Sequence, residues 1–226
     1  MELGSGMDGG LYRTIAEWAD RQPDWLRSLI SGYAEYGLAV FALLMVWGWW
    51  AARPAPGRAM ARAWAAPVAV VAAYGINEVV KAAAREVRPC VALRVRTVVV
   101  CPGRTDWSFP SNHAVIAAAA AVAAVGLALS VPRAPRTAGP AGSPRGRRGV
   151  GWMALVSVVA ALLMGASRVL VGVHYPHDVW AGWVVGAVVG GLLVWAAALL
   201  GGVVDRARGS DFGWVVFGRG EGPVGW

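Results

Sequence analysis

The chain has 226 residues but only one lysine. The other 20 of its 21 basic residues are arginines. Charged residues make up only 15% of the sequence, whereas soluble domains carry about 25%. Hydrophobic residues reach 57% and are clustered in long blocks. Residues 1–33 lack the basic and apolar regions of a signal peptide, so we expect none there. Low charge and clustered apolar residues together indicate a membrane protein and exclude an ordinary soluble domain.

Several apolar blocks approach the roughly 20 residues that a helix needs to cross a bilayer. They are residues 34–52, 60–82, 112–131, 150–168 and 179–204. The sequence therefore predicts an all-α, polytopic membrane bundle of about five transmembrane helices. In the last block, Gly182, Gly186 and Gly190 recur every four residues, a spacing that favours close packing of a neighbouring helix within the bundle.

The segments outside these blocks divide the chain further. Residues 1–33 place apolar side chains at helical spacing between charges, which indicates an amphipathic segment in the membrane interface. A packed helical cap explains the same pattern equally well. We expect residues 34–204 to form the transmembrane domain and residues 205–226 a poorly ordered tail. Residues 132–149 are rich in Pro, Gly and Arg and are expected to form a flexible linker.

The net charge of +8 is unevenly distributed along the chain. The loops after the first and third blocks carry arginines, such as Arg53 and Arg133, but no Asp or Glu. The positive-inside rule makes these loops cytoplasmic, together with the tail, and it places the acidic N-terminal segment outside. The basic charge thus predicts topology, and we expect no nucleic-acid partner.

The two cysteines, Cys90 and Cys101, flank one loop on the predicted outer side. An even number of cysteines in an oxidising compartment favours one disulfide, although two free thiols remain an alternative.

The unusual polar residues gather at the outer ends of the predicted helices. Ionisable groups at membrane depth are costly, so they are candidates for function. They are Lys81, Arg88, Ser111, His113, Ser167, Arg168, His174, His177 and Asp178.

Local spacing predicts how some of these side chains are arranged. Lys81 and Arg88 are seven residues apart, so we expect both on one face of a helix that Pro89 closes. Ser111 suits the N-cap of the third span, and His113 then lies in its first turn, where backbone N–H groups attract anions.

The segment "HYPHD" predicts a second arrangement of this kind. Pro176 suits the first position of a helix. His174 would precede that helix, and Asp178, four residues later, could accept a hydrogen bond from one of its ring nitrogens. A histidine oriented by a carboxylate suits a nucleophile that attacks phosphorus, and a second histidine can protonate the departing oxygen. Nearby cations and helix N-termini suit a phosphate, and this chemistry needs no metal or other cofactor.

The stretches "KAAAREVRP", "PSNH" and "SRVLVGVHYPHD" resemble the three signature motifs of the type 2 phosphatidic acid phosphatase superfamily, K-x6-R-P, P-S-G-H and S-R-x5-H-x3-D. The resemblance covers roughly residues 34–204. It implies that His174 is a nucleophile forming a phosphohistidine, that Asp178 orients it, and that His113 is the general acid. The residues that it implies for binding phosphoryl oxygens are Lys81, Arg88, Ser111 and Arg168.

Two positions depart from the superfamily pattern. Asn112 replaces the usual glycine, and "SFPSNHA" with "GVHYPHD" is most similar to bacterial undecaprenyl-diphosphate phosphatases. That resemblance implies a polyprenyl diphosphate substrate in a bacterial plasma membrane. The amide of Asn112 could donate a further hydrogen bond to such a substrate, and the topology from the positive-inside rule places the active site outside the cytoplasm. His177 is the second departure, and we interpret it as a surface histidine that tunes local charge rather than as a third catalytic histidine.

Three alternatives remain open. The substrate could be phosphatidic acid or phosphatidylglycerol phosphate within the same superfamily. A lipid carrier or flippase could bind phosphate headgroups without hydrolysis. A metal site built from His113, His174, His177 and Asp178 is disfavoured because the adjacent cations would repel the metal. The expected partners are a lipid phosphate or diphosphate and the bilayer, and the sequence predicts no oligomeric state.

Overall fold

The computed structural model describes residues 8–103, 105–131, 144–210 and 213–218, and all regular elements within them are helices. In chain order they are α2 (Gly9–Asp20), α3 (Asp24–Tyr36), α4 (Leu38–Ala52), α5 (Gly57–Ala84), α6 (Pro89–Ala92), α7 (Asn112–Ser130), α8 (Pro144–Leu170), α9 (Pro176–Ala197), a 3-10 turn (Ala198–Leu200), α10 (Gly201–Ala207) and α11 (Gly213–Phe217).

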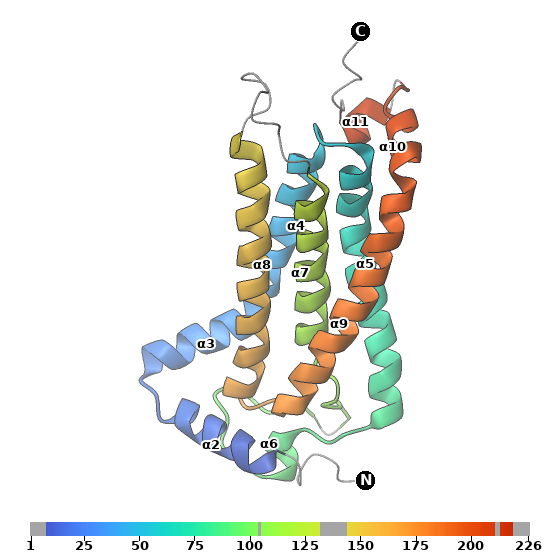
Figure 1. Cartoon of the computed structure of the whole chain (residues 1–226). Helices are drawn as coiled ribbons and strands as arrows, with labels where there is room; N and C mark the ends of the chain where they lie inside the picture. Colours follow the sequence, from blue (N-terminus) through green and yellow to red (C-terminus); the bar gives the residue numbers. More distant parts are fainter. Residues whose placement is uncertain (1–7, 104, 132–143, 211–212, 219–226) are drawn as a thin grey trace.

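Five of these helices, α4, α5, α7, α8 and α9, run side by side along one axis (Figure 1). Helix α7 packs against all four of the others. Helices α2, α3 and α6 lie at one end of the bundle and α10 and α11 at the other (Figure 1). Within the described ranges, four helices are long and apolar enough to cross a membrane, and the pair α3 and α4 makes a fifth candidate span that is bent by 51°. The predicted all-α membrane bundle is confirmed.

The bend lies at Gly37, between α3 and α4. A Cβ atom there would lie 2.4 Å from the carbonyl oxygen of Tyr33, so the chain needs glycine at this position. The first predicted span, 34–52, therefore includes the end of α3 as well as α4.

The predicted linker and tail differ from the structure where they can be compared. Helix α8 begins at Pro144, so the last part of the expected 132–149 linker is helical. Within the expected 205–226 tail, residues 205–207 belong to α10 and residues 213–217 form α11. Residues 132–143 and 219–226, and also Arg104, lie outside the described residues.

The glycine stripe of α9 faces α7, as predicted. A Cβ atom on Gly186 would lie 2.2 Å from the carbonyl oxygen of Val115, and the equivalent atoms on Gly182 and Gly190 would also meet α7 within 3 Å. Only glycine permits this approach, which is the packing expected between membrane helices. It also aligns the ends of the two helices, because the Ser111 N–H donates to the Asp178 carbonyl over 3.0 Å.

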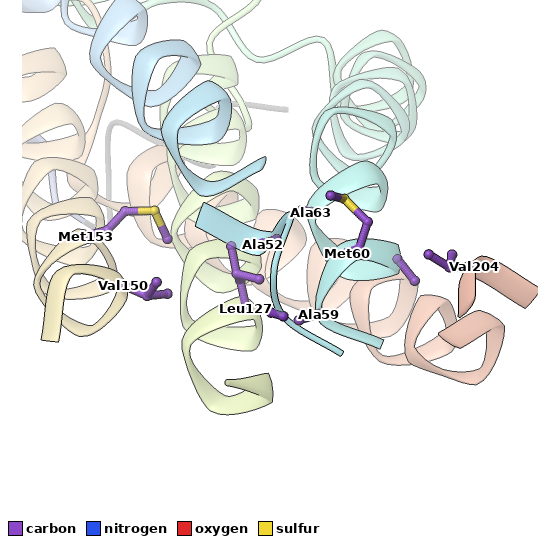
Figure 2. Close-up of a cluster of buried hydrophobic side chains, with 10 residues drawn as sticks. Ala52, Ala59, Met60, Ala63, Leu127, Val150, Met153 and Val204 are labelled. Carbon is purple, nitrogen blue, oxygen red and sulfur yellow. The ribbon is translucent and has the colours of Figure 1, made fainter. Parts of the chain in front are cut away.

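A cluster of buried apolar residues joins five helices at the end of the bundle that carries α10 (Figure 2). Ala52 of α4, Met60 of α5, Leu127 of α7, Met153 of α8 and Val204 of α10 contribute to it. Most of its other members are alanines, and small side chains let membrane helices approach closely enough for van der Waals contact.

The N-terminal helix α2 is attached to the end of the bundle that carries α6. Tyr12, Ala16 and Ala19 are buried, and the Tyr12 hydroxyl donates to the Gly172 carbonyl over 2.8 Å. One face of α2 is therefore packed against the bundle. Its other face exposes apolar side chains such as Trp18.

Candidate active site

Four segments meet at the end of the bundle that α2 covers: the end of α5, the loop before α7, the end of α8 and the loop into α9 (Figure 1). His174 lies in the last of these loops and is 2% exposed. Three cations from two distant parts of the sequence, Lys81 and Arg88 from one and Arg168 from the other, all act electrostatically on its ring. The structure therefore brings together the residues that the sequence motifs predicted.

One nitrogen of His174 is held by Asp178. The distance between Nδ1 of His174 and Oδ2 of Asp178 is 3.2 Å, and the carboxylate is fully buried. The same oxygen accepts from the Tyr175 backbone N–H at 2.8 Å and from the Ser108 hydroxyl. An ionised carboxylate only accepts hydrogen bonds, so Nδ1 carries the ring proton.

The other nitrogen, Nε2, faces Arg88, whose Nη1 lies 3.1 Å away. A guanidinium only donates, so Nε2 presents its lone pair and the ring is neutral. Burial, followed by the charges of Arg88, Arg168 and Lys81, holds the pKa of His174 well below its usual value. The site thus contains a neutral imidazole whose unprotonated nitrogen, Nε2, faces the Arg88 guanidinium.

The structure corrects the predicted geometry of Lys81 and Arg88. Helix α5 ends at Ala84, and Arg85 follows it in the left-handed conformation with φ of 49°. Pro89 restricts Arg88 to extended backbone, with ψ of 143°. The prediction that Lys81 and Arg88 share one helical face is therefore wrong, although their side chains still converge.

Lys81 and Arg88 converge on Asp106, a residue that the sequence reasoning missed. Oδ1 of Asp106 lies 3.8 Å from Nζ of Lys81 and 2.9 Å from Nη2 of Arg88. Partial burial would raise the pKa of Asp106, but the hydrogen bond and charge of Arg88, together with the charge of Lys81, outweigh it and lower that pKa. A carboxylate oxygen therefore occupies a position between two cations that would also suit a phosphoryl oxygen.

Ser108, which contacts both Asp178 and His174, was also missed. Asp106 and Ser108 lie in the loop just before "FPSNH", where no helical or strand periodicity marks them. Their nearness to the second motif was the only signal in the sequence that could have drawn attention to them.

Ser111 stands at the N-cap of α7, as predicted, but its side chain makes no capping hydrogen bond. Its buried hydroxyl oxygen has no hydrogen-bond partner among the described residues. His113 lies in the first turn of α7, is partly buried, and interacts electrostatically with Arg168 and His174. The Ser111 hydroxyl is therefore a buried polar group that is unpaired within the described residues.

Asn112 has a different setting from the one expected. Its amide nitrogen donates to Oε1 of Glu78 at 2.7 Å, and its amide oxygen accepts from Asn77 at 2.6 Å. Both partners lie on α5, so Asn112 joins α7 to α5 and keeps only one N–H for any other acceptor.

Arg168 lies in the last turn of α8. Its Nη1 donates to the Ala34 carbonyl over 3.0 Å, which fixes one edge of the guanidinium. Its buried Nε atom makes no hydrogen bond within the part of the chain that the structure describes. One buried donor of this cation is therefore unpaired within the described residues.

One group of side chains in the described ranges has ligand atoms close enough to hold a metal ion, and it consists of Glu86, His177 and Asp178. The metal site considered from the sequence also included His113 and His174, which are not members of this group.

A disulfide joins Cys90 to Cys101, with their Cα atoms 6.1 Å apart. It follows directly after Arg88 and Pro89, and so it restrains the segment that presents the Arg88 guanidinium.

The fold and site define a multi-pass membrane protein with a polar site at one end of a helical bundle. Comparison with known families gives a match to the PAP2 superfamily over residues 62–200, a range that contains all three motifs. The chain belongs to the PAP2 superfamily, a family of membrane-embedded lipid phosphate phosphatases.

Two similar proteins carry informative names. An undecaprenyl-diphosphatase of Sulfolobus acidocaldarius is 33% identical over 120 residues, which is 53% of this chain, and the match spans only about half (48%) of that relative's length. The undecaprenyl-diphosphatase BcrC of Bacillus subtilis is 30% identical over 180 residues, which cover 80% of this chain and 79% of that protein.

A solved structure has a similar fold. It is the first transmembrane PAP2-type phosphatidylglycerolphosphate phosphatase from Bacillus subtilis, with a TM-score of 0.58 and 21% identity, and the match covers 84% of this chain and 86% of that one. At this identity the likeness establishes the helical fold.

Proposed function

We propose that this protein hydrolyses a polyprenyl diphosphate to the monophosphate and inorganic phosphate, and so regenerates a lipid carrier. The observation that carries the proposal is the setting of His174, whose Nδ1 faces Asp178 at 3.2 Å while its Nε2 faces Arg88 at 3.1 Å. A fixed neutral imidazole beside several cations suits attack on a phosphorus atom.

In the first step Nε2 of His174 attacks the distal phosphorus, and the bond between that phosphorus and the bridging oxygen breaks. The product is a phosphohistidine, and the imidazolium charge that develops on the ring is stabilised by Asp178. Lys81, Arg88 and Arg168 hold the phosphoryl oxygens, and the unpaired hydroxyl of Ser111 donates to one of them.

His113 donates a proton to the departing lipid monophosphate in this step. In the second step a water molecule attacks the phosphohistidine while His113 takes up a proton from that water. The N–P bond breaks, inorganic phosphate leaves, and His174 returns to its neutral form. Both steps balance without an added cofactor, and the charge stabilisation that a metal could supply comes here from three cationic side chains.

The diphosphate assignment is supported by charge and by similarity. Lys81, Arg88 and Arg168 provide more positive charge than a phosphate monoester requires. The two relatives that match at 30% identity or more are both named undecaprenyl-diphosphatase. Asn112 keeps one N–H that could reach the second phosphate, although its other contacts bind it to α5.

A substrate panel tests the proposal. Purified protein in detergent is given polyprenyl diphosphate, polyprenyl phosphate, phosphatidic acid or phosphatidylglycerol phosphate, each with excess chelator. We expect the fastest release of inorganic phosphate from the diphosphate, with no pyrophosphate formed. A kinetic preference for phosphatidic acid or phosphatidylglycerol phosphate would overturn the substrate. Binding of lipid without release of phosphate would indicate a carrier instead.

We further propose that the active site faces outward from a bacterial plasma membrane. Arg53, which follows α4, and Arg58, in the first turn of α5, lie together with α10 at the end of the bundle opposite the loop that carries His174 (Figure 1). The positive-inside rule makes that end cytoplasmic. An impermeant maleimide should label Ser28→Cys, in α3, in intact cells, but label Ser210→Cys, which follows α10, only after permeabilisation. The reverse pattern would invert the topology.

A further inference from the structure

His177 has a structural setting that the proposed chemistry does not use. Its ring stacks on Tyr175 with centroids 5.2 Å apart and lies near Phe109. Its Nδ1 is 2.9 Å from Oδ1 of Asp8, and its Nε2 is 3.1 Å from Oε1 of Glu86. Both ring nitrogens therefore meet carboxylates, which come from opposite sides of the imidazole.

This arrangement fixes the charge of the ring. Ionised carboxylates only accept hydrogen bonds, so each nitrogen must carry a proton to bond its neighbour. A neutral imidazole would direct a lone pair at one carboxylate. The side chains of His177, Asp8 and Glu86 are only 17%, 15% and 12% exposed, so water screens that repulsion weakly. The geometry requires an imidazolium between two acids.

The same ring faces the carboxylate that orients His174. Oδ1 of Asp178 is buried and makes no hydrogen bond with any described residue, and Nε2 of His177 lies 3.4 Å from it. The other oxygen, Oδ2, is held by Ser108, Tyr175 and His174. His177 thus supplies a positive charge beside Oδ1 of Asp178, a buried oxygen whose negative charge would otherwise have no partner among the described residues.

The ring also connects the N-terminal segment to the site. Asp8 bonds the His177 ring through Oδ1 and accepts the His177 backbone N–H through Oδ2, at 2.9 Å in each case. Asp8 directly precedes α2, whose Tyr12 holds the loop of His174 through Gly172. Glu86 extends the connection to the segment between Lys81 and Arg88.

We propose that His177 is a positioning residue that acts as an imidazolium between Asp8 and Glu86. Its charge fixes Asp178, and through it the Nε2 atom of His174, and it attaches α2 to the catalytic end of the bundle. This inference rests on the proposed function for its catalytic consequence, but the charge state can be tested without any substrate.

The charge state is measured by NMR on protein labelled with ¹⁵N-histidine in micelles. The chain has only three histidines, so His177→Gln identifies the His177 signals by their loss. At pH about 7.5 an unperturbed histidine is roughly nine-tenths neutral. We expect His177 to show two protonated nitrogens there, and Asp8→Asn with Glu86→Gln to convert it to the neutral form. A neutral His177 in the wild-type protein would overturn the proposal.

The catalytic consequence is measured with whichever lipid of the panel the wild-type protein hydrolyses fastest. His177→Gln should lower kcat about tenfold to hundredfold, the scale of one hydrogen bond to a charged group, and leave KM unchanged because His177 does not bind substrate. Adding Glu86→Gln should restore part of kcat, because it removes one of the uncompensated acids. A merely structural role would not give this rescue.

Arg21→Gln is the matched control, because it removes an exposed cation of the same end of the bundle and should change neither constant. Wild-type kcat in His177→Gln, or a double variant worse than either single one, would contradict the inference. Zn²⁺ binding is a further test. If the wild-type protein binds Zn²⁺ at neutral pH and His177→Gln does not, Nε2 of His177 has an available lone pair, and the proposed imidazolium is overturned. If no lipid were hydrolysed, the proposed function would fail while the NMR result stood.

Discussion

Nη1 of Arg88 lies 3.1 Å from Nε2 of His174, so the cation that we propose to bind phosphate faces the proposed nucleophilic nitrogen directly. The same nitrogen of Arg88 donates to the Val173 carbonyl at 2.9 Å, which fixes the guanidinium against the loop that carries His174. Cation and nucleophile are therefore positioned relative to each other before substrate binds. This preorganisation is what a site for developing negative charge needs.

The pairing of His174 with Asp178 gives the first prediction. Asp178→Asn should lower kcat by about three to four orders of magnitude, because an amide can select the wrong tautomer of His174. His174→Ala should also abolish the acid-labile phosphoenzyme, trapped from a ³²P-labelled diphosphate. A trapped phosphoenzyme in His174→Ala would assign the nucleophile elsewhere.

The second prediction concerns His113. Because a good leaving group needs no proton, His113→Ala should lose much more activity on a lipid substrate than on an aryl phosphate such as p-nitrophenyl phosphate. The ratio of kcat/KM for the two substrates measures this, with wild-type protein as reference. Equal losses on both would contradict the general-acid role.

The third prediction concerns Lys81, the only lysine of the chain, which is 6% exposed. Lys81→Arg keeps the charge but places a larger planar group in a buried space beside Asp106. We expect a loss of roughly tenfold or more in kcat/KM. Full activity would mean that an ammonium group is not required there.

Asp106 gives the fourth prediction, because its carboxylate pairs with both Lys81 and Arg88. Asp106→Asn removes the competing charge, while the backbone carbonyl of residue 106 still accepts from Nε of Arg88, as it does at 2.9 Å in the native protein. Inorganic phosphate should therefore inhibit this variant more strongly, with a lower Ki. An unchanged or higher Ki would show that Asp106 does not compete with phosphate.

The fifth prediction concerns pH. Burial and three cations keep the pKa of His174 well below about 6.5, so the nucleophile stays neutral as the pH falls through that value. With an aryl phosphate, the rate of phosphoenzyme formation should stay nearly constant between pH 7.5 and 6. A decrease with a midpoint near pH 6.5 would contradict a depressed pKa.

The same pKa shift has a consequence for stability. Below about pH 6.5 the unfolded chain takes up a proton on His174 that the folded chain does not. The contribution of His174 to stability is therefore constant above that pH and decreases as the pH falls below it. The free energy of unfolding of the His174→Gln variant should therefore lack the decrease that protonation of His174 causes below about pH 6.5.

The sequence was sufficient for the bundle and for the local part of the site. Long apolar blocks predict spans because backbone groups in lipid must be satisfied within a helix. The relation between His174 and Asp178 follows from their separation of four positions in the sequence. The stripe of Gly182, Gly186 and Gly190 predicted the close helix contact that α9 makes with α7. These features depend on short separations along one element.

The tertiary structure alone decided the contacts between distant loops. Helix α5 ends at Ala84, four residues before Arg88, so convergence of the two cations depends on Asp106 and not on helical spacing. Asp8 and His177 are 169 residues apart, and no local pattern relates them. Such contacts arise because packing of α2 and the loops brings charged groups together where burial forces them to pair.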